Sequence, residues 1–531
     1  MKAVHCCLLA LTIGATACTS NPNPSGPASA HVVDPRAAAH LLNRLSFGPR
    51  PDSIEHVQAI GLQAYIELQL HPDRIADADL DRRLADLKAL TISPRAFAVD
   101  YYQPMNVARQ EFTDTQKLRA GGPPLRYLRW HLQPIAAMTL PGDKPINAIQ
   151  QAAVTQEEIR FQRENQDVFD QLQAQKLLRA VYSERQLQEV LVDFWFNHFN
   201  VDARKIEDRP VVVEYERDVI RPRVLGRFRD LLGATAHSPA MLFYLDNWMS
   251  AGTGRGVNEN YGRELLELHT LGVDGGYTQH DVAEVARAFT GWTLRNPHDG
   301  SGFFFDMKKH DHNAKRVLGH TVKAGRGVED GEQVLDILAK HPSTAHFIAA
   351  RLVQHFVADD PPPALVDRVA KTFRKTDGDL REVMRTILTS REFLDRSDYR
   401  AKVKSPFEYV ASALRATNAS ITNPRSFVGT ISNIGEPLYQ CQPPTGYDDL
   451  SRVWINTGTL VSRLNFAQSL TANGANAAKV DLPHTDEDLG RFAQAILGGD
   501  LSTRTQEALV ARMSLTLRTA IVLGSPEFQH R

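Results

Sequence analysis

The segment from Asn258 to Gly272 gathers charged and amide side chains on what its spacing predicts to be one helix. Its apolar residues Tyr261, Leu265 and Leu268 recur at intervals of four and three, which is typical of a buried helical stripe. The polar residues beside that stripe are Glu259, Asn260, Arg263, Glu264 and Glu267. Because an unpaired charge is costly to bury, these groups must pair with one another, bind a metal or carry out acid–base chemistry.

Glu264 and Glu267 are the carboxylates of this helix that lack a simple structural explanation. Asn258 is a good N-cap, and Glu259 falls in the first turn, where the helix dipole favours a negative charge. The later two lie on one face, and the simplest interpretation pairs Glu267 with Arg263 four residues before it. As a metal signal the Glu-x-x-Glu pair is weak, because no Glu-x-x-His motif accompanies it.

A histidine on a second predicted helix is a candidate for the same site. Leu187, Val190, Leu191 and Phe194 recur with His198 on one face, so His198 should point towards the core. One interpretation is a core histidine that is hydrogen-bonded to the backbone, since partial burial is normal for histidine. The other is a metal ligand or a proton carrier.

A third candidate source of ligands is the run Lys309-His-Asp-His-Asn313. In an extended backbone His310 and His312 face the same way, as a His-x-His metal pair must. The alternative is a His310-Asp311 turn that only organises a loop. The flanking segments Phe303–Phe305 and Arg316–Val322 are apolar and β-branched, which predicts the two arms of a β-hairpin.

These segments lead to two hypotheses about function. In the first, the protein is an enzyme whose groups converge on one pocket, bordered by Asp246 and covered by an aromatic loop around Trp454. Its catalytic residues would be His198, Arg263, Glu264, Glu267, His310 and Asp311, and a divalent metal would be bound by His198, Glu264, Glu267, His310 and His312. In the second, the protein is a non-catalytic envelope binding or scaffold protein whose buried charges form a structural ion-pair network.

The elements that must position these residues are mostly helices. Helical spacing dominates the chain, so the expected fold is mainly α, a large multi-helix single domain over 34–531 with a small β-hairpin insertion. Its parts are N-terminal helices in 34–182 with an irregular excursion over 102–154, core motifs in 183–327 and C-terminal helices in 328–531. Thr278-x-x-Asp281 predicts a capped helix start, and two final helices are expected at about 486–497 and 503–522. With a net charge of -1, nothing favours a nucleic-acid partner.

The N-terminus predicts export. Residues 1–17 resemble a signal peptide, with an apolar run from Cys6 to Ala17 that is too short to span a bilayer. Ala15-Thr-Ala-Cys18 resembles a lipobox, so we expect lipidation of Cys18, a flexible tether over 18–33 and a location facing the periplasm or the cell surface, at the outer membrane. Ordinary cleavage after Ala17 is the alternative. Cys441 is then the one thiol of the folded body, and we expect it to be buried and inert.

Several motif blocks occur in one order along the chain. They are Phe194-Trp-x-Asn-His-Phe199, Ala240-Met-Leu-x-Tyr-Leu-Asp246, Asn258 to Gly272, Gly276-Tyr-Thr-x-x-Asp-Val282, Ala286-Arg-Ala-Phe-Thr-Gly-Trp292, His310-Asp311, Lys404-Ser-Pro406, Pro443-Pro444 and Trp454 to Asn465. From about Ala38 to Phe528 the chain resembles the bacterial domain-of-unknown-function 1800 family. The activity of that family is not established. Members are often encoded beside a secreted sulfatase-like family, so the resemblance implies such a protein as a partner.

Overall fold

Helices form most of the fold. The computed structural model describes residues 33–119, 146–205, 209–254, 256–296, 300–396, 399–472, 477–499 and 501–531, and Val33–Arg531 forms one compact unit. Helix accounts for 63% of the structure, and in the described ranges the strands form only two-stranded sheets, so the predicted mainly α class is confirmed. Among these residues, no helix combines the length and apolar character needed to cross a bilayer.

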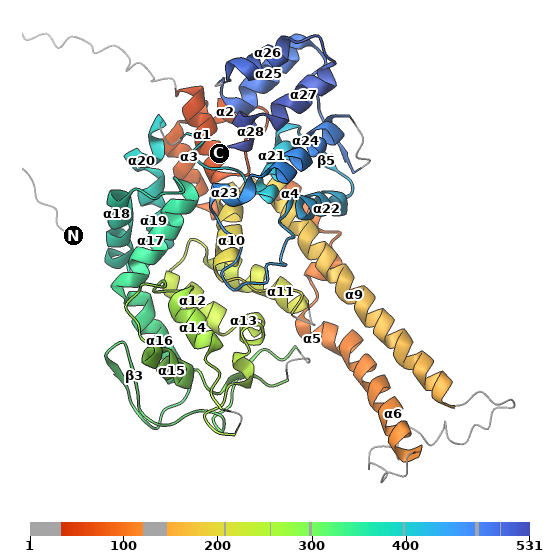
Figure 1. Ribbon diagram of the computed structural model, residues 1–531, viewed down its shortest axis with the longest axis vertical. Helices are drawn as coiled ribbons and strands as arrows, with labels where there is room; N and C mark the ends of the chain where they lie inside the picture. The colour runs from red at the N-terminus through yellow and green to blue at the C-terminus, as the bar shows by residue number, and fades with distance from the viewer. Residues whose placement is uncertain are drawn as a thin grey trace, which may run out of the picture. The chain divides into compact units, whose positions relative to one another are not determined.

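The N-terminal part consists of short helices followed by a pair of long ones. The short elements are α1 (Pro35–Leu45), α2 (Ser53–Ile60), α3 (Leu62–Gln69), η1 (Pro72–Arg74), α4 (Ala78–Leu84), η2 (Lys88–Leu90), α5 (Pro94–Phe97) and η3 (Ala98–Tyr102). The long pair is α6 (Gln103–Arg119) and α9 (Ile146–Tyr182), which contact each other and run side by side (Figure 1). Two parts of the predicted irregular excursion, 103–119 and 146–154, are therefore helical. The rest of the excursion, 120–145, lies outside the described residues.

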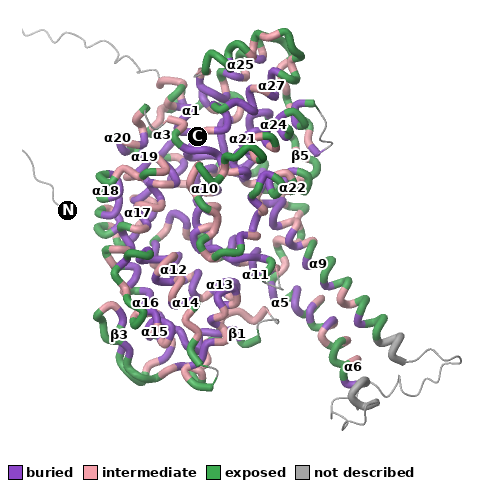
Figure 2. Tube along the Cα trace, in the orientation of Figure 1, coloured by how far each residue is buried: buried purple, intermediate pink, exposed green. Residues whose placement is uncertain are grey.

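The middle of the chain forms the centre of the fold. Its helices are α10 (Gln186–His198), α11 (Pro210–Glu214), η4 (Tyr215–Ile220), η5 (Arg221–Arg223), α12 (Phe228–Ala236), α13 (Pro239–Tyr244), η6 (Asn247–Met249), α14 (Asn260–Glu267) and α15 (Gln279–Ala288). α10 is largely buried (Figure 2), and its buried residues include the polar Gln186, Glu189 and His198 beside the apolar ones. It supplies part of the lining of the cavity described below.

The predicted single hairpin is two hairpins. Strand β2 (Phe303–Phe305) pairs with β1 (Trp292–Leu294), with Trp292 opposite Phe305. Strand β3 (Lys315–Val317) pairs with β4 (His320–Val322). The predicted pairing of Phe303–Phe305 with Arg316–Val322 is therefore wrong. The Trp292–Leu294 segment is fully buried and directly follows a helix, so its helical spacing concealed a strand.

Helices also form the C-terminal part. They are α16 (Glu329–Lys340), α17 (Pro342–Phe356), α18 (Pro363–Lys375), α19 (Leu380–Leu388), α20 (Arg391–Leu394), α21 (Pro406–Ala416), α22 (Pro424–Ile434), α23 (Ser451–Trp454), α24 (Thr457–Thr471), α25 (Asp486–Leu497), α26 (Thr503–Val510), α27 (Leu515–Gly524) and α28 (Pro526–Gln529). A third small sheet pairs β5 (Ser420–Ile421) with β6 (Ala478–Lys479). The long irregular connection between α22 and α23 is the segment that matters most for the candidate site.

Candidate functional site

The central helix α14 pairs its charges differently from the sequence prediction. Arg263 contacts Glu259 at 3.1 Å and Gln279 at 3.1 Å, whereas Glu267 accepts a hydrogen bond from the Tyr277 hydroxyl at 3.3 Å. The predicted pairing of Arg263 with Glu267 is therefore wrong. The competing partners Tyr277 and Gln279 come from the next segment of the chain, so helical spacing alone could not reveal them.

Glu264 lines a wide hollow of about 1070 Å³, a volume that includes open solvent. The hollow is also lined by Asp246, as predicted for the border of the site, and by Asp202, Lys205 and Asn260. Burial, followed by the charge of Glu267, raises the pKa of the Glu264 carboxyl. Neither His198 nor His310 lines this hollow.

His198 is a core histidine. It is 5% exposed, and its Nε2 lies 3.2 Å from the backbone carbonyl of His269. Rings of Phe194, Trp195, Phe199 and Phe347 surround it. Burial, reinforced by His269 and Arg351, lowers its pKa well below the ordinary value, so the ring is neutral. These contacts are those of a core histidine that is hydrogen-bonded to the backbone, the first of the two interpretations of the sequence.

The histidines of the Lys309–Asn313 run are bound to the surrounding protein. His310 is buried, with Nδ1 at 2.7 Å from the Thr290 carbonyl and Nε2 at 3.2 Å from Asp330. Asp311 pairs with Arg287 at 2.8 Å and accepts the Asn313 N–H. Both nitrogens of the exposed His312 lie close to backbone carbonyls. Both ring nitrogens of His310 thus have partners within the protein. These contacts are those of the alternative interpretation, a His310-Asp311 turn that organises a loop.

The structure thus divides the proposed residues among three places. Glu264 lines an open hollow, His198 lies in the aromatic core, and His310 with Asp311 organises a turn. Throughout the described ranges, no three His, Cys, Asp or Glu side chains come together as a metal ion would require. The proposed five-residue metal set is therefore not assembled in this structure.

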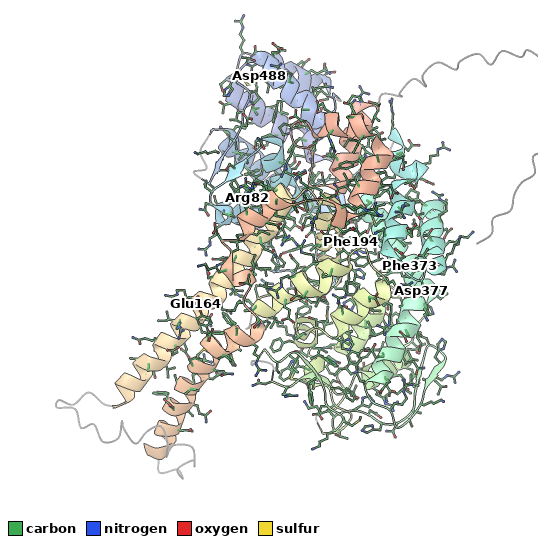
Figure 3. All side chains as sticks on the ribbon, turned by 180° about the vertical axis from the view of Figure 1, so that it is seen from behind. Arg82, Glu164, Phe194, Phe373, Asp377 and Asp488 are labelled. Carbon is green, nitrogen blue, oxygen red and sulfur yellow. The ribbon has the colours of Figure 1, made fainter. Side chains whose placement is uncertain are left out.

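A different cavity brings together more titratable groups than any of these three places. It encloses about 750 Å³, open solvent included, between α9, α10, α17, the start of α21 and the connection from α22 to α23. Phe194, labelled in Figure 3, is one of its lining residues. The others include Lys176, Asp193, Asn197, Asn200, Arg351, His355, Ser405, Glu408, Glu436, Tyr439, Cys441, Tyr447, Asp448, Asp449 and Trp454. The aromatic segment around Trp454, predicted to cover a pocket, lines this cavity.

Glu436 is a buried carboxyl group in this cavity. It follows α22 and accepts the backbone N–H of Phe407, in the first turn of α21, at 2.8 Å. Burial raises its pKa to about 8, with a further contribution from the negative charge of Asp193, and the hydrogen bond from Phe407 only partly opposes the rise. Glu436 therefore carries a proton at neutral pH and can donate it.

His355 and Asp449 form a dyad in the same cavity. His355 Nδ1 lies 3.1 Å from Asp449 Oδ1, and its Nε2 has no protein partner within the described structure. Burial alone would raise the pKa of Asp449, but its contact with His355, followed by the charges of Lys402 and Arg531, outweighs this effect and holds that pKa well below the usual range. The ionised carboxylate fixes Nδ1 as the donor, which leaves Nε2 to accept a proton.

A buried charge network supports the wall of the cavity. Lys176 Nζ lies 2.5 Å from Asp193 and 4.9 Å from the Tyr439 ring centre. The Tyr439 hydroxyl donates to Glu216 at 2.5 Å, and Glu216 pairs with Arg221 at 3.1 Å. Burial would raise the pKa of Glu216, but Arg221 and then Lys176 lower it overall, so Glu216 is ionised.

Two asparagines hold the connection between α22 and α23 against α10. Asn197 both donates to the Tyr447 carbonyl, at 2.8 Å, and accepts its N–H, at 2.7 Å. Asn200 donates to the carbonyls of Cys441 and Pro443, each at 2.9 Å. Gly446 lies against Asn197 with φ +72°, where a Cβ would come within 2.3 Å of the Asn197 carbonyl. Only glycine fits there, so the connection is packed in one conformation.

Cys441 is buried, as predicted. It is 6% exposed, and burial, followed by the charge of Asp202, raises its pKa to about 11. A thiol that stays protonated at neutral pH is a poor nucleophile. Cys441 therefore contributes shape rather than reactivity to the cavity wall.

Sequence reasoning missed Glu436, His355, Asp449 and Asp193. Each stands alone in the sequence, with no motif spacing to mark it. A signal nevertheless existed, because several of the motif blocks contribute to this one cavity. Their contributions are Phe194 and Asn197 from the first block, Ser405 from Lys404-Ser-Pro406, and Trp454.

The fold and the site define a mainly helical protein with a polar cavity that combines a protonated carboxyl and a His–Asp dyad. Over residues 40–530 the chain matches the model of the family described as protein of unknown function (DUF1800), and it belongs to that family. Searches of curated proteins and of solved structures found no match.

Proposed function

We propose that this protein is an acid–base enzyme whose site is the cavity between α10, α17 and the connection from α22 to α23. One observation carries the proposal: Glu436, protonated at neutral pH, shares a cavity with a His355–Asp449 dyad whose Nε2 has no partner among the described residues. A protonated carboxyl that shares a pocket with an imidazole oriented by a carboxylate supplies a proton donor and a proton acceptor.

The two groups would divide the proton transfers of a hydrolysis. His355 Nε2 accepts the proton of an attacking water molecule, and Asp449 stabilises the imidazolium that forms. The water oxygen bonds to the electrophilic carbon as the bond to the leaving group breaks. Glu436 then supplies the proton that the leaving group needs. The proton on His355 then returns through solvent to Glu436, so both groups are restored and the reaction balances with water as the only co-reactant.

The lining favours a substrate that combines apolar and polar surface. The charged side chains Lys176, Asp193 and Glu408 are paired within the protein. Arg351, which contacts the neutral Gln354 at 3.1 Å, and exposed Asp448 are the charged groups that the lining offers to a ligand. Trp454 and Tyr447 add half-buried aromatic surface, their ring centres 6.1 Å apart. Aromatic faces together with hydrogen-bonding groups suit a ligand with an apolar face and a polar edge.

A substrate screen with matched variants tests the proposal. Chromogenic glycosides and esters and a peptide library would be incubated with the wild type and with His355→Gln, Glu436→Gln and the control Glu267→Gln. A true substrate is turned over by the wild type and the control, and kcat falls by about 10²–10⁴-fold in the two cavity variants. Equal turnover in all four proteins would show that this cavity is not the site of the reaction, and no turnover by the wild type would favour the non-catalytic scaffold.

We also propose that the enzyme is exported and held at the outer membrane by a lipid on Cys18, where a secreted sulfatase-like protein is a candidate partner. The proposal rests on the apolar run and the lipobox-like Ala15-Thr-Ala-Cys18. Cys18→Ser should abolish lipidation, because the thioether carries the acyl chains, and should move the protein out of the membrane fraction or leave it uncut. Cell fractionation and mass spectrometry of the N-terminus measure both effects. Unchanged processing and fractionation would contradict lipid attachment.

A further inference from the structure

Arg531 lies behind the cavity. It contacts the His355–Asp449 dyad on one side and Glu408, in the first turn of α21, on the other. Its side chain is 3% exposed. One guanidinium nitrogen lies 2.7 Å from Glu408 Oε1, and the other lies 3.3 Å from the His355 carbonyl and 3.8 Å from Asp449 Oδ1. A single planar cation thus spans two carboxylates that belong to different elements.

Glu408 connects Arg531 to the α21 turn that binds Glu436, the proposed proton donor. Its other carboxylate oxygen accepts the Ser405 N–H at 2.8 Å and closes the capping box at the start of α21. The next N–H along this turn that binds a carboxylate is that of Phe407, which holds Glu436. The turn that positions Glu436 is therefore tied to Arg531 through Glu408.

Backbone hydrogen bonds to Lys402 fix the position of Arg531. Arg531 N–H donates to the Lys402 carbonyl at 2.8 Å, and Lys402 N–H donates back at 3.2 Å. The Lys402 ammonium binds Asp359 at 2.7 Å and the Asp449 carbonyl at 2.5 Å. Asp449 is thus approached by two buried cations, and Arg531 is the one that also reaches Glu408.

We propose that Arg531 is a positioning residue that aligns the His355–Asp449 dyad with the α21 turn that binds Glu436. The inference rests on the proposed function, because alignment matters only if these groups transfer protons. Arginine suits this role since its rigid fork can hold two acceptors at once, which a lysine ammonium does less well. Without it, the Asp449 carboxylate loses a contact, and the hydrogen bond that fixes His355 Nδ1 as donor weakens.

The tautomer of His355 reports on this alignment directly. In ¹⁵N-histidine-labelled protein, at a pH where the ring is neutral, the wild type should show the Nδ1–H form. Arg531→Gln should change the tautomer ratio several-fold, because it removes the cation 3.8 Å from Asp449 Oδ1 and the 2.7 Å ion pair with Glu408. His355→Gln assigns the signal. Arg518→Gln is the matched control, because Arg518 is another buried arginine, whose guanidinium binds Asp486 and the Leu509 carbonyl rather than Asp449 or Glu408.

The outcomes separate the two proposals. A changed ratio in Arg531→Gln with a wild-type ratio in Arg518→Gln supports the positioning role, and a wild-type ratio in both overturns it.

If Arg531→Gln does not fold, Glu408→Gln replaces it: this variant keeps the guanidinium but removes its partner in α21. A smaller change in the same direction is then expected, and no change contradicts the inference. If the ratio changes while His355→Gln keeps full turnover, positioning stands and the acid–base function fails.

Discussion

Glu436→Gln should make the protein more stable than the wild type at alkaline pH and leave the two equal at about pH 4. The folded-state pKa of Glu436 is raised to about 8, above its ordinary value, so the native state holds a proton that the unfolded state releases. Glutamine mimics the protonated carboxyl and still accepts the Phe407 N–H. It keeps the favourable contacts and cannot ionise.

The pH window follows from the direction of this shift. The stability linked to the Glu436 proton is fully present below the ordinary glutamate pKa of about 4.3 and is lost as the pH rises through about 8. A shift of this size corresponds to at most about 5 kcal/mol between those limits. Urea unfolding of both proteins from about pH 5 to pH 9 measures the difference. Parallel curves across this range would show that Glu436 is ionised throughout, and Glu436 would then be no proton donor.

Buried Lys404 changes stability in the opposite direction and must be separated from this effect. Burial lowers its pKa to about 7, so its proton is lost from the folded state first, and its contribution to stability rises with pH above that value. Both proteins carry Lys404, so its contribution cancels in the difference between them. The difference curve therefore isolates Glu436, whereas the wild-type curve alone would not.

Glu216→Ala should lower the free energy of unfolding by about 3–5 kcal/mol, the cost of breaking a buried ion pair from one side. Glu216 is 1% exposed and is the common partner of Arg221, Gln175 and Tyr439. Its loss leaves Arg221 with Glu189 as the remaining close carboxylate and removes the acceptor of a buried tyrosine hydroxyl. Chemical denaturation of the two proteins measures the loss.

Glu267→Ala is the matched control for this experiment. Glu267 is half-buried, and its partner is the Tyr277 hydroxyl at 3.3 Å rather than a buried cation, so its loss should cost under about 1 kcal/mol. The sequence had instead predicted that this residue pairs with Arg263. Equal losses for Glu216→Ala and Glu267→Ala would show that the network around Glu216 has no special role in stability.

Local signals in the sequence predicted the helices well where a cap marked their ends. The Thr278–Asp281 capping box begins α15, and α25 spans the expected Asp486–Leu497. The predicted helix over 503–522 is instead α26 and α27, because Ser514 caps a new helix start that its neighbours did not reveal. Helical spacing reads the periodicity of one element. It carries no information on which strand pairs with Phe303–Phe305.

The candidate site could be predicted only in part, since its groups meet through tertiary contacts. The aromatic segment at Trp454 was recognisable by composition, and it lines the cavity. The shifted pKa of Glu436 depends on burial beneath α21 and on Asp193 from α10, which are distant in the sequence. His355 resembles any histidine on an apolar helix until Asp449 is placed beside it. Conversely, the charged residues around Glu264 formed a candidate site because they lie close together in the sequence. Several of them only contact near neighbours along the chain.

The hydrogen bonds that Asn197 and Asn200 make to the α22–α23 connection affect the free energy of ligand binding. A loop that folds around its ligand loses conformational entropy on binding, of the order of 1–2 kcal/mol for each residue fixed. Here that loss has already occurred during folding, so a small ligand with few contacts can still bind measurably. The same rigidity limits adjustment to other shapes. We therefore expect selectivity to arise from exclusion by a preformed wall rather than from closure around the preferred molecule.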